Sequence, residues 1–76
     1  MLDLGDLLTL IRLTELELNT LQADIDGDDE QAKNDAGEVI VQVDTLANKL
    51  KKMYLNAYSD DCGYPNYEEY IQQFRR

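Results

Sequence analysis

Hydrophobic residues recur at three- and four-residue spacing along two long segments, as they do on one face of an amphipathic α-helix. The first segment covers residues 4–25 and the second covers residues 32–57. The stretch between them, residues 24–30, is strongly acidic and contains a glycine. This pattern predicts two long helices, over about residues 3–26 and 28–59, that pack against each other as an antiparallel hairpin.

Capping residues mark the ends of these predicted helices. Carboxylates at Asp3 or Asp6 favour the positive end of the first helix. Gly27 is expected to end that helix in the left-handed conformation. Asp28 is expected to be the N-cap of the second helix, with Gln31 reaching back to it as in a capping box.

Each predicted helix has one apolar face that is assigned to the core. On the first helix this face consists of Leu4, Leu7, Leu8, Ile11, Leu18, Leu21 and Ile25, with Leu10 at its margin. On the second helix it consists of Ala32, Ala36, Val39, Ile40, Val43, Leu46, Ala47, Leu50, Met53, Tyr54, Ala57 and Tyr58. A charge placed on this second stripe, as in Leu46→Asp, is expected to unfold the domain. Gly37 lowers helix propensity there and indicates a bend or a close contact.

The last third of the chain predicts a loop over residues 60–65 and a short helix over residues 66–75, started by Asn66 with Glu69. The aromatic residues gather in this third, at Tyr54, Tyr58, Tyr64, Tyr67, Tyr70 and Phe74. They predict a small core where the tail folds back on the second helix. Tyr64 lies in the loop and is also a candidate for contact with a partner. The expected fold class is therefore all-α, with a hairpin of two long helices and a short third helix in a single domain, residues 1–76.

Charge and length restrict the partners. The chain has 76 residues, with 7 Lys and Arg against 16 Asp and Glu, for a formal net charge of -9. Direct binding of nucleic acid is not expected, because it requires clustered basic residues. No leader peptide is recognised, and no apolar run reaches the ~20 residues of a membrane span. The lone Cys62 excludes an intrachain disulfide and fits a reducing compartment. We expect a soluble, cytoplasmic protein.

Catalysis is not expected, because the chain has no histidine, one cysteine and one serine, and so lacks nucleophile and base pairs. The glycines are isolated and form no phosphate-binding loop. We therefore expect no catalytic residue, no cofactor and no dedicated metal site. Weak calcium binding remains a minor alternative, since Asp24, Asp26, Asp28 and Glu30 alternate. Their register differs from that of a calcium loop, because Asp29 stands where the turn glycine belongs.

A second apolar line runs along the back of the first helix. It is termed the leucine line and consists of Leu2, Thr9, Leu13, Leu16, Thr20 and Ala23. A two-helix hairpin cannot cover it, so it is the main candidate for binding a partner. The acidic turn is the second candidate surface and consists of Asp24, Asp26, Asp28, Asp29, Glu30 and Asp35.

These surfaces predict a non-enzymatic protein-binding module. In the first hypothesis, a small inhibitor or adaptor docks on a larger protein through the leucine line, and the acidic turn meets a basic surface, including that of a nucleic-acid-binding protein. Small phage-borne antagonists of host machinery often have this form. In the second hypothesis, two copies form a homodimeric four-helix bundle with a structural role. In a third, the tail helix covers the leucine line.

Overall fold

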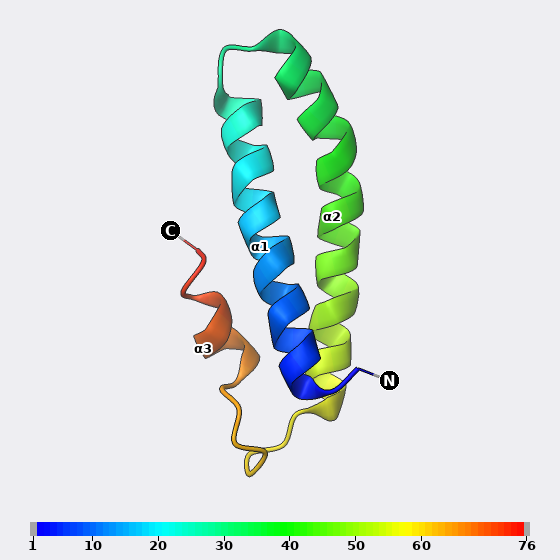
Figure 1. The fold of residues 1–76 in the computed structure, drawn as a ribbon, viewed down its shortest axis with the longest axis vertical. Coiled ribbons are helices and arrows are strands. Elements are labelled where there is room, and N and C mark those ends of the chain that lie inside the picture. Colours follow the sequence, from blue (N-terminus) through cyan, green and yellow to red (C-terminus); the bar gives the residue numbers. More distant parts are fainter. Residues whose placement is uncertain (1, 76) are drawn as a thin grey trace.

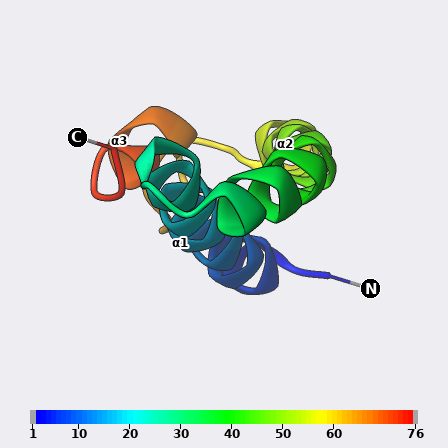
Figure 2. The ribbon, with the colours of Figure 1, turned by 90° about the horizontal axis from the view of Figure 1, so that it is seen from above.

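The computed structural model describes residues 2–75 and is all-helical over that range, which confirms the predicted fold class. It contains α1 (Leu4–Asp26), α2 (Glu30–Ala57) and α3 (Tyr67–Ile71). The two long helices lie side by side and antiparallel, and α3 lies beside the first half of α1 (Figure 1). Seen along the hairpin, α1 occupies one corner of a triangle whose other corners are α2 and α3 (Figure 2). Residues 1 and 76 of the predicted domain lie outside the described residues.

Helix α1 begins at the predicted position. The Asp3 side chain accepts a hydrogen bond of 2.8 Å from the backbone amide of Asp6, and the Asp6 side chain accepts one of 3.1 Å from the amide of Asp3. This reciprocal pair is a capping box, which satisfies two amides that helical bonding leaves without partners. The acidic start of the chain therefore fixes where α1 begins.

The connection between α1 and α2 differs from the prediction in two details. Gly27 has φ -80° and ψ -176°, so it is extended and the predicted left-handed cap is wrong. The N-cap of α2 is Asp29, one residue after the predicted Asp28, and its Oδ1 accepts from the amides of Gln31 and Ala32 at 3.0 and 3.3 Å. The chain crosses between the helices in an extended conformation, and the capping role falls to the last extended residue before α2.

The core lies where all three helices meet. Its buried side chains come in pairs from α1, α2 and α3, and they are Leu7, Ile11, Leu50, Tyr54, Tyr67 and Ile71. The tail thus folds back as predicted, but it packs on α1 as well as on α2. The Tyr70 hydroxyl donates to the carbonyl of Leu8 at 3.2 Å, and the Asn19 amide donates to the carbonyl of Phe74 at 2.9 Å. These bonds attach the tail along α1.

The prediction of the core face of α2 is partly wrong. Four of its residues are exposed, namely Val39, Leu46, Met53 and Ala57. Helix α1 covers only a narrow sector of α2, and α3 packs at one edge of this sector. The opposite margin of the apolar stripe, which carries the four exposed residues, therefore has no neighbouring helix. Gly37 has no heavy atom within 4 Å of the position that a Cβ would take, so the close contact expected there is absent.

The helix ends also differ slightly from the predicted boundaries. Helix α2 ends at Ala57, before the predicted residue 59, and α3 covers only Tyr67–Ile71 of the predicted residues 66–75. Asn66 is the N-cap of α3, as expected, and accepts from the amide of Glu69 at 2.8 Å. After Ile71 the chain continues as turns, in which the Phe74 amide bonds the Ile71 carbonyl at 3.0 Å.

Across residues 2–75, no helix combines the length and the apolarity that crossing a bilayer requires.

Candidate functional site

The leucine line is exposed along the whole of α1. Leu2, Leu13 and Leu16 are 46, 55 and 42% exposed. The other members, Thr9, Thr20 and Ala23, are exposed as well. The tail helix therefore does not cover this line, and the third hypothesis for its role is wrong in the monomer. The reason is that the buried side chains of α3, Tyr67 and Ile71, pack into the core between the long helices.

The threonines of the leucine line contribute apolar surface. The Thr9 hydroxyl donates to the carbonyl of Gly5 at 3.1 Å, and the Thr20 hydroxyl donates to the carbonyl of Leu16 at 3.1 Å. Each hydroxyl is therefore satisfied within the helix. Their methyl groups extend the apolar surface that the leucines present to a partner.

A further exposed apolar strip lies on α2, where sequence reasoning had assigned core. It consists of Val39, Leu46 and Met53, which are spaced by seven residues and are 42, 48 and 44% exposed. We call these three residues the α2 strip. A spacing of seven returns to nearly the same side of a helix. The α2 strip is therefore one continuous line.

The two lines face different directions. Lys51, whose Nζ lies 5.2 Å from the centre of the Tyr67 ring, marks the side of α2 that faces α3. Successive helical residues turn by ~100°, which places Leu46 roughly 140° from Lys51, so the α2 strip faces away from α3. On α1, Leu16 lies roughly 180° from the core residue Leu7 and roughly 60° from Asn19, which bonds the tail. The leucine line therefore lies on the back of α1, pointing away from the core.

The acidic turn occupies the end of the hairpin farthest from α3. All six of its carboxylates belong to exposed residues. Asp29 is the N-cap of α2, and Asp26 accepts a hydrogen bond of 3.1 Å from the Gln22 side chain. Within residues 2–75, no three His, Cys, Asp or Glu side chains gather as metal ligands do.

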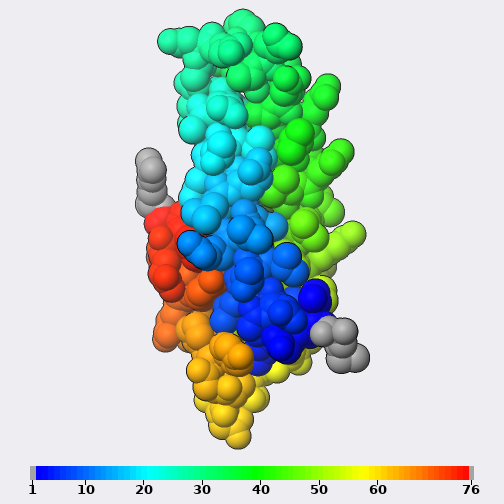
Figure 3. Space-filling model, viewed as in Figure 1, coloured from blue at the N-terminus to red at the C-terminus, as the bar shows by residue number. Residues whose placement is uncertain are grey.

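The loop of residues 60–65, which contains Tyr64, lies at the opposite end of the molecule from the acidic turn (Figure 3). Tyr64 is 42% exposed, and its hydroxyl reaches the start of α1, 3.3 Å from the position that a Cβ on Gly5 would take. The structure thus does not bring Tyr64 and the acidic turn together. One contact surface that includes both would have to span the length of the hairpin.

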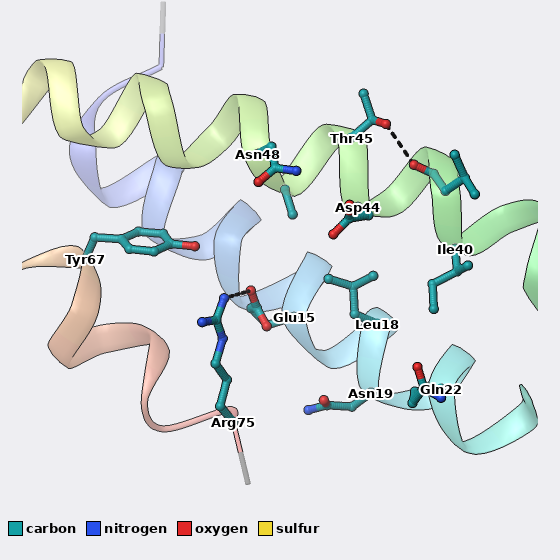
Figure 4. A pocket seen from close by; sticks show the side chains of 12 residues that line it. Glu15, Leu18, Asn19, Gln22, Ile40, Asp44, Thr45, Asn48, Tyr67 and Arg75 are labelled. Atoms are coloured by element: carbon teal, nitrogen blue, oxygen red, sulfur yellow. Dashed lines mark hydrogen bonds and ion pairs between the residues drawn. The ribbon is translucent and has the colours of Figure 1, made fainter. Parts of the chain in front are cut away.

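A groove between α1 and α2, beside the tail, was missed by sequence reasoning. Its volume is about 580 Å³, and it is bordered by Glu15, Asn19, Asp44, Asn48, Tyr67 and Arg75 (Figure 4). Glu15 is buried in it, with 6% exposure, and lies 3.7 Å from the guanidinium of Arg75. The sequence contained one indication of this groove, because Glu15 lies among the core positions of α1, four residues after Ile11. A charged residue at such a position is rarely buried without a partner.

No protein-family model matches the chain, and no significant match was found among curated proteins or among solved structures. The functional argument therefore rests on the exposed surfaces and on the groove.

Proposed function

We propose that this protein is a non-enzymatic interaction module that docks on another protein through the leucine line. The observation that carries the proposal is the exposure of Leu2, Leu13 and Leu16 in a chain whose third helix packs elsewhere. Monomeric proteins rarely leave a continuous apolar line in solvent, and leucines along one helix face are a common form of helix-to-helix interface.

The energetic argument concerns the leucine side chains. Complete burial of one leucine contributes ~1.5–3 kcal/mol. Leu2, Leu13 and Leu16 each retain about half of their exposure, so covering them contributes several kcal/mol before the cost of association. This is enough to anchor an interface, and the surrounding contacts would provide specificity.

The acidic turn complements this anchor. Its six carboxylates lie at one end of the hairpin, in a chain with a net charge of -9. Such a field accelerates encounter with a basic surface and disfavours acidic partners. A small inhibitor or adaptor of a basic protein, including one that binds nucleic acid, fits this arrangement.

A second candidate function is self-association into a helical bundle with a structural role. The observation that favours it is the α2 strip, Val39, Leu46 and Met53, which repeats every seven residues and is exposed, as the leucine line is. Two hairpins that join through these exposed lines would form a four-helix bundle with heptad-like packing.

The test compares the solution mass of the parent with that of a Leu13→Glu, Leu16→Glu double variant, by light scattering on a sizing column at several concentrations. Leu55→Glu is the control, because Leu55 is 50% exposed and belongs to neither line. A parent dimer that only the double variant converts to a folded monomer favours the bundle.

A monomeric parent is the result expected for docking on a foreign partner, and a pull-down from cells that contain the protein follows. The partner should be lost with the double variant and retained with Leu55→Glu. A partner retained equally by all three proteins would contradict the role of the leucine line.

A further inference from the structure

The side of the hairpin that carries α3 is only partly covered. Side chains of α3 pack against α1 and α2 near the start of α1, and beyond them α1 and α2 border the groove of about 580 Å³. The apolar part of its lining comes from Leu18, Ile40, Val41 and Ala47. Polar side chains of α1, α2 and the tail surround this apolar part (Figure 4). An apolar surface with a few convergent polar groups is typical of a binding site.

The Tyr67 hydroxyl is directed into this groove (Figure 4). The residue is 5% exposed, and within residues 2–75 no polar side-chain atom is both buried and without a hydrogen-bond partner, so solvent reaches this hydroxyl from the groove. Of the other tyrosines in or against the core, Tyr54 donates to Pro65 and Tyr70 donates to Leu8, whereas the Tyr67 hydroxyl bonds no other group of residues 2–75. It is therefore available to a ligand group in the groove.

The carboxylates determine the sign of the charge that fits. Glu15 is 6% exposed, and its ion pair at 3.7 Å is with an Arg75 side chain that is 55% exposed. Asp44, on α2, points into the groove (Figure 4) and has no ion pair among the described residues. Two carboxylates and one guanidinium leave the groove with a net negative charge. A buried carboxylate whose partner is long and half-exposed is stabilised by a second cation.

We propose that this groove binds a lysine or arginine side chain from a basic segment of a partner protein. The aliphatic stem would lie on Leu18, Ile40 and Ala47, as such stems do on apolar surface. The cationic head would donate to the oxygens of Tyr67, Glu15 and Asp44. The volume exceeds that of one side chain, so neighbouring residues of the segment also fit.

This site lies between the long helices beside α3, whereas the leucine line lies on the back of α1 and contributes no residue to the groove. The inference therefore goes beyond the proposed docking function, and each can fail without the other.

The experiment is an ¹⁵N NMR titration of the full chain. The probes are two peptides, acetyl-Gly-Lys-Gly-amide and acetyl-Gly-Arg-Gly-amide, and an acetyl-Gly-norleucine-Gly-amide control that keeps the stem and lacks the charge. We expect saturable shifts of the side-chain amide signals of Asn19, Gln22 and Asn48 with the two cationic peptides. Equal shifts with the norleucine peptide would overturn the proposal, since the charge would then be irrelevant.

Two variants locate the binding. Asp44→Asn should weaken it at least about threefold, which is the size expected for loss of one partly exposed charge contact. Tyr67→Phe keeps the ring in the core and should also weaken it. Glu38→Gln removes the same charge on another side of α2, at an exposed residue outside the acidic turn, and should leave the affinity unchanged.

Equal losses in Asp44→Asn and Glu38→Gln would overturn the proposal, because they would indicate general attraction to an acidic protein. Spermidine provides the last comparison. If it shifts the same signals at lower concentrations than the peptides, the groove is a site for free amines and the assignment to a protein segment is wrong.

Discussion

The hydroxyl of Tyr54 donates a hydrogen bond to the carbonyl of Pro65, two residues before α3 begins. Tyr54 is fully buried in α2, so this bond connects the core of the hairpin directly to the loop that leads into the tail. The tail is thereby fixed at its start, while Tyr70 and Asn19 bond it to α1 further along.

Removing this hydroxyl tests how much the connection contributes. Tyr54→Phe keeps the ring and should lower the free energy of unfolding by about 1–2 kcal/mol, because the Pro65 carbonyl loses its donor. Urea unfolding followed by circular dichroism measures this. Tyr64→Phe is the control and should change stability by less than about 0.5 kcal/mol, since Tyr64 is 42% exposed. Equal effects of the two changes would contradict the role of the bond.

Two leucines of α2 should respond very differently to the same substitution. Leu50 is 3% exposed, so Leu50→Asp buries an unpaired charge and should unfold the chain. Leu46 is 48% exposed, so Leu46→Asp should leave the helical circular dichroism spectrum intact, contrary to the sequence-based expectation. A folded Leu50→Asp variant, or an unfolded Leu46→Asp monomer, would show that the face of α2 has been misassigned.

Replacing two glycines by alanine tests two different effects, which are helix propensity at Gly37 and backbone conformation at Gly63. Both have open space where a Cβ would lie, but Gly63 has φ +84° whereas Gly37 is within α2. Gly37→Ala should stabilise the protein by about 1 kcal/mol, which raises the melting temperature by about 4–8 °C in a domain of this size. Gly63→Ala should destabilise it by about 1–2 kcal/mol, because an L side chain is strained there. Thermal melts of both variants measure whether each substitution raises or lowers the stability. A Gly63→Ala variant that is more stable than the parent would contradict the structure.

Alkaline pH should destabilise the fold through its buried tyrosines. Burial raises the pKa of Tyr54 and of Tyr67 above the ordinary value of 10.0, and for Tyr67 the nearby Glu15 carboxylate adds to the effect. The neutral phenol is thus favoured in the folded state. The corresponding stability is present below pH ~10 and is lost as the pH rises through the folded-state pKa.

The check is the free energy of unfolding in urea at several pH values from about 8 to about 11, with phenolate absorbance recorded in parallel. Tyr67→Phe should reduce the alkaline loss. A free energy that stays constant across this range would contradict the raised pKa values.

The sequence predicted the features that depend on neighbouring residues. The start of α1 was correct because the Asp3 and Asp6 carboxylates cap amides three residues away. The error of one residue at Asp29 has a local cause too, since Asp28 and Asp29 are adjacent and either can serve as the N-cap, so only the backbone path selects between them. The exposure of the leucine line was also expected, because no second face of α1 could be covered by a single partner helix.

The groove could not be predicted in the same way. Glu15, Asp44 and Tyr67 come from three helices and are brought together only because α3 packs beside both long helices. The core face of α2 was predicted only in part for a related reason. Three- and four-residue spacing identifies an apolar face, but the width of that face that is buried depends on how many helices pack against it.

By itself, therefore, the sequence determined that this chain is an acidic helical hairpin with a short aromatic tail helix, because periodicity, capping and charge are properties of local segments. The tertiary structure alone decided which sectors of α1 and α2 are buried, that the α2 strip is exposed, and that Tyr67 and Glu15 share a groove. The physical reason is that burial is set by the packing of residues distant in the chain, and the position of α3 determines it here.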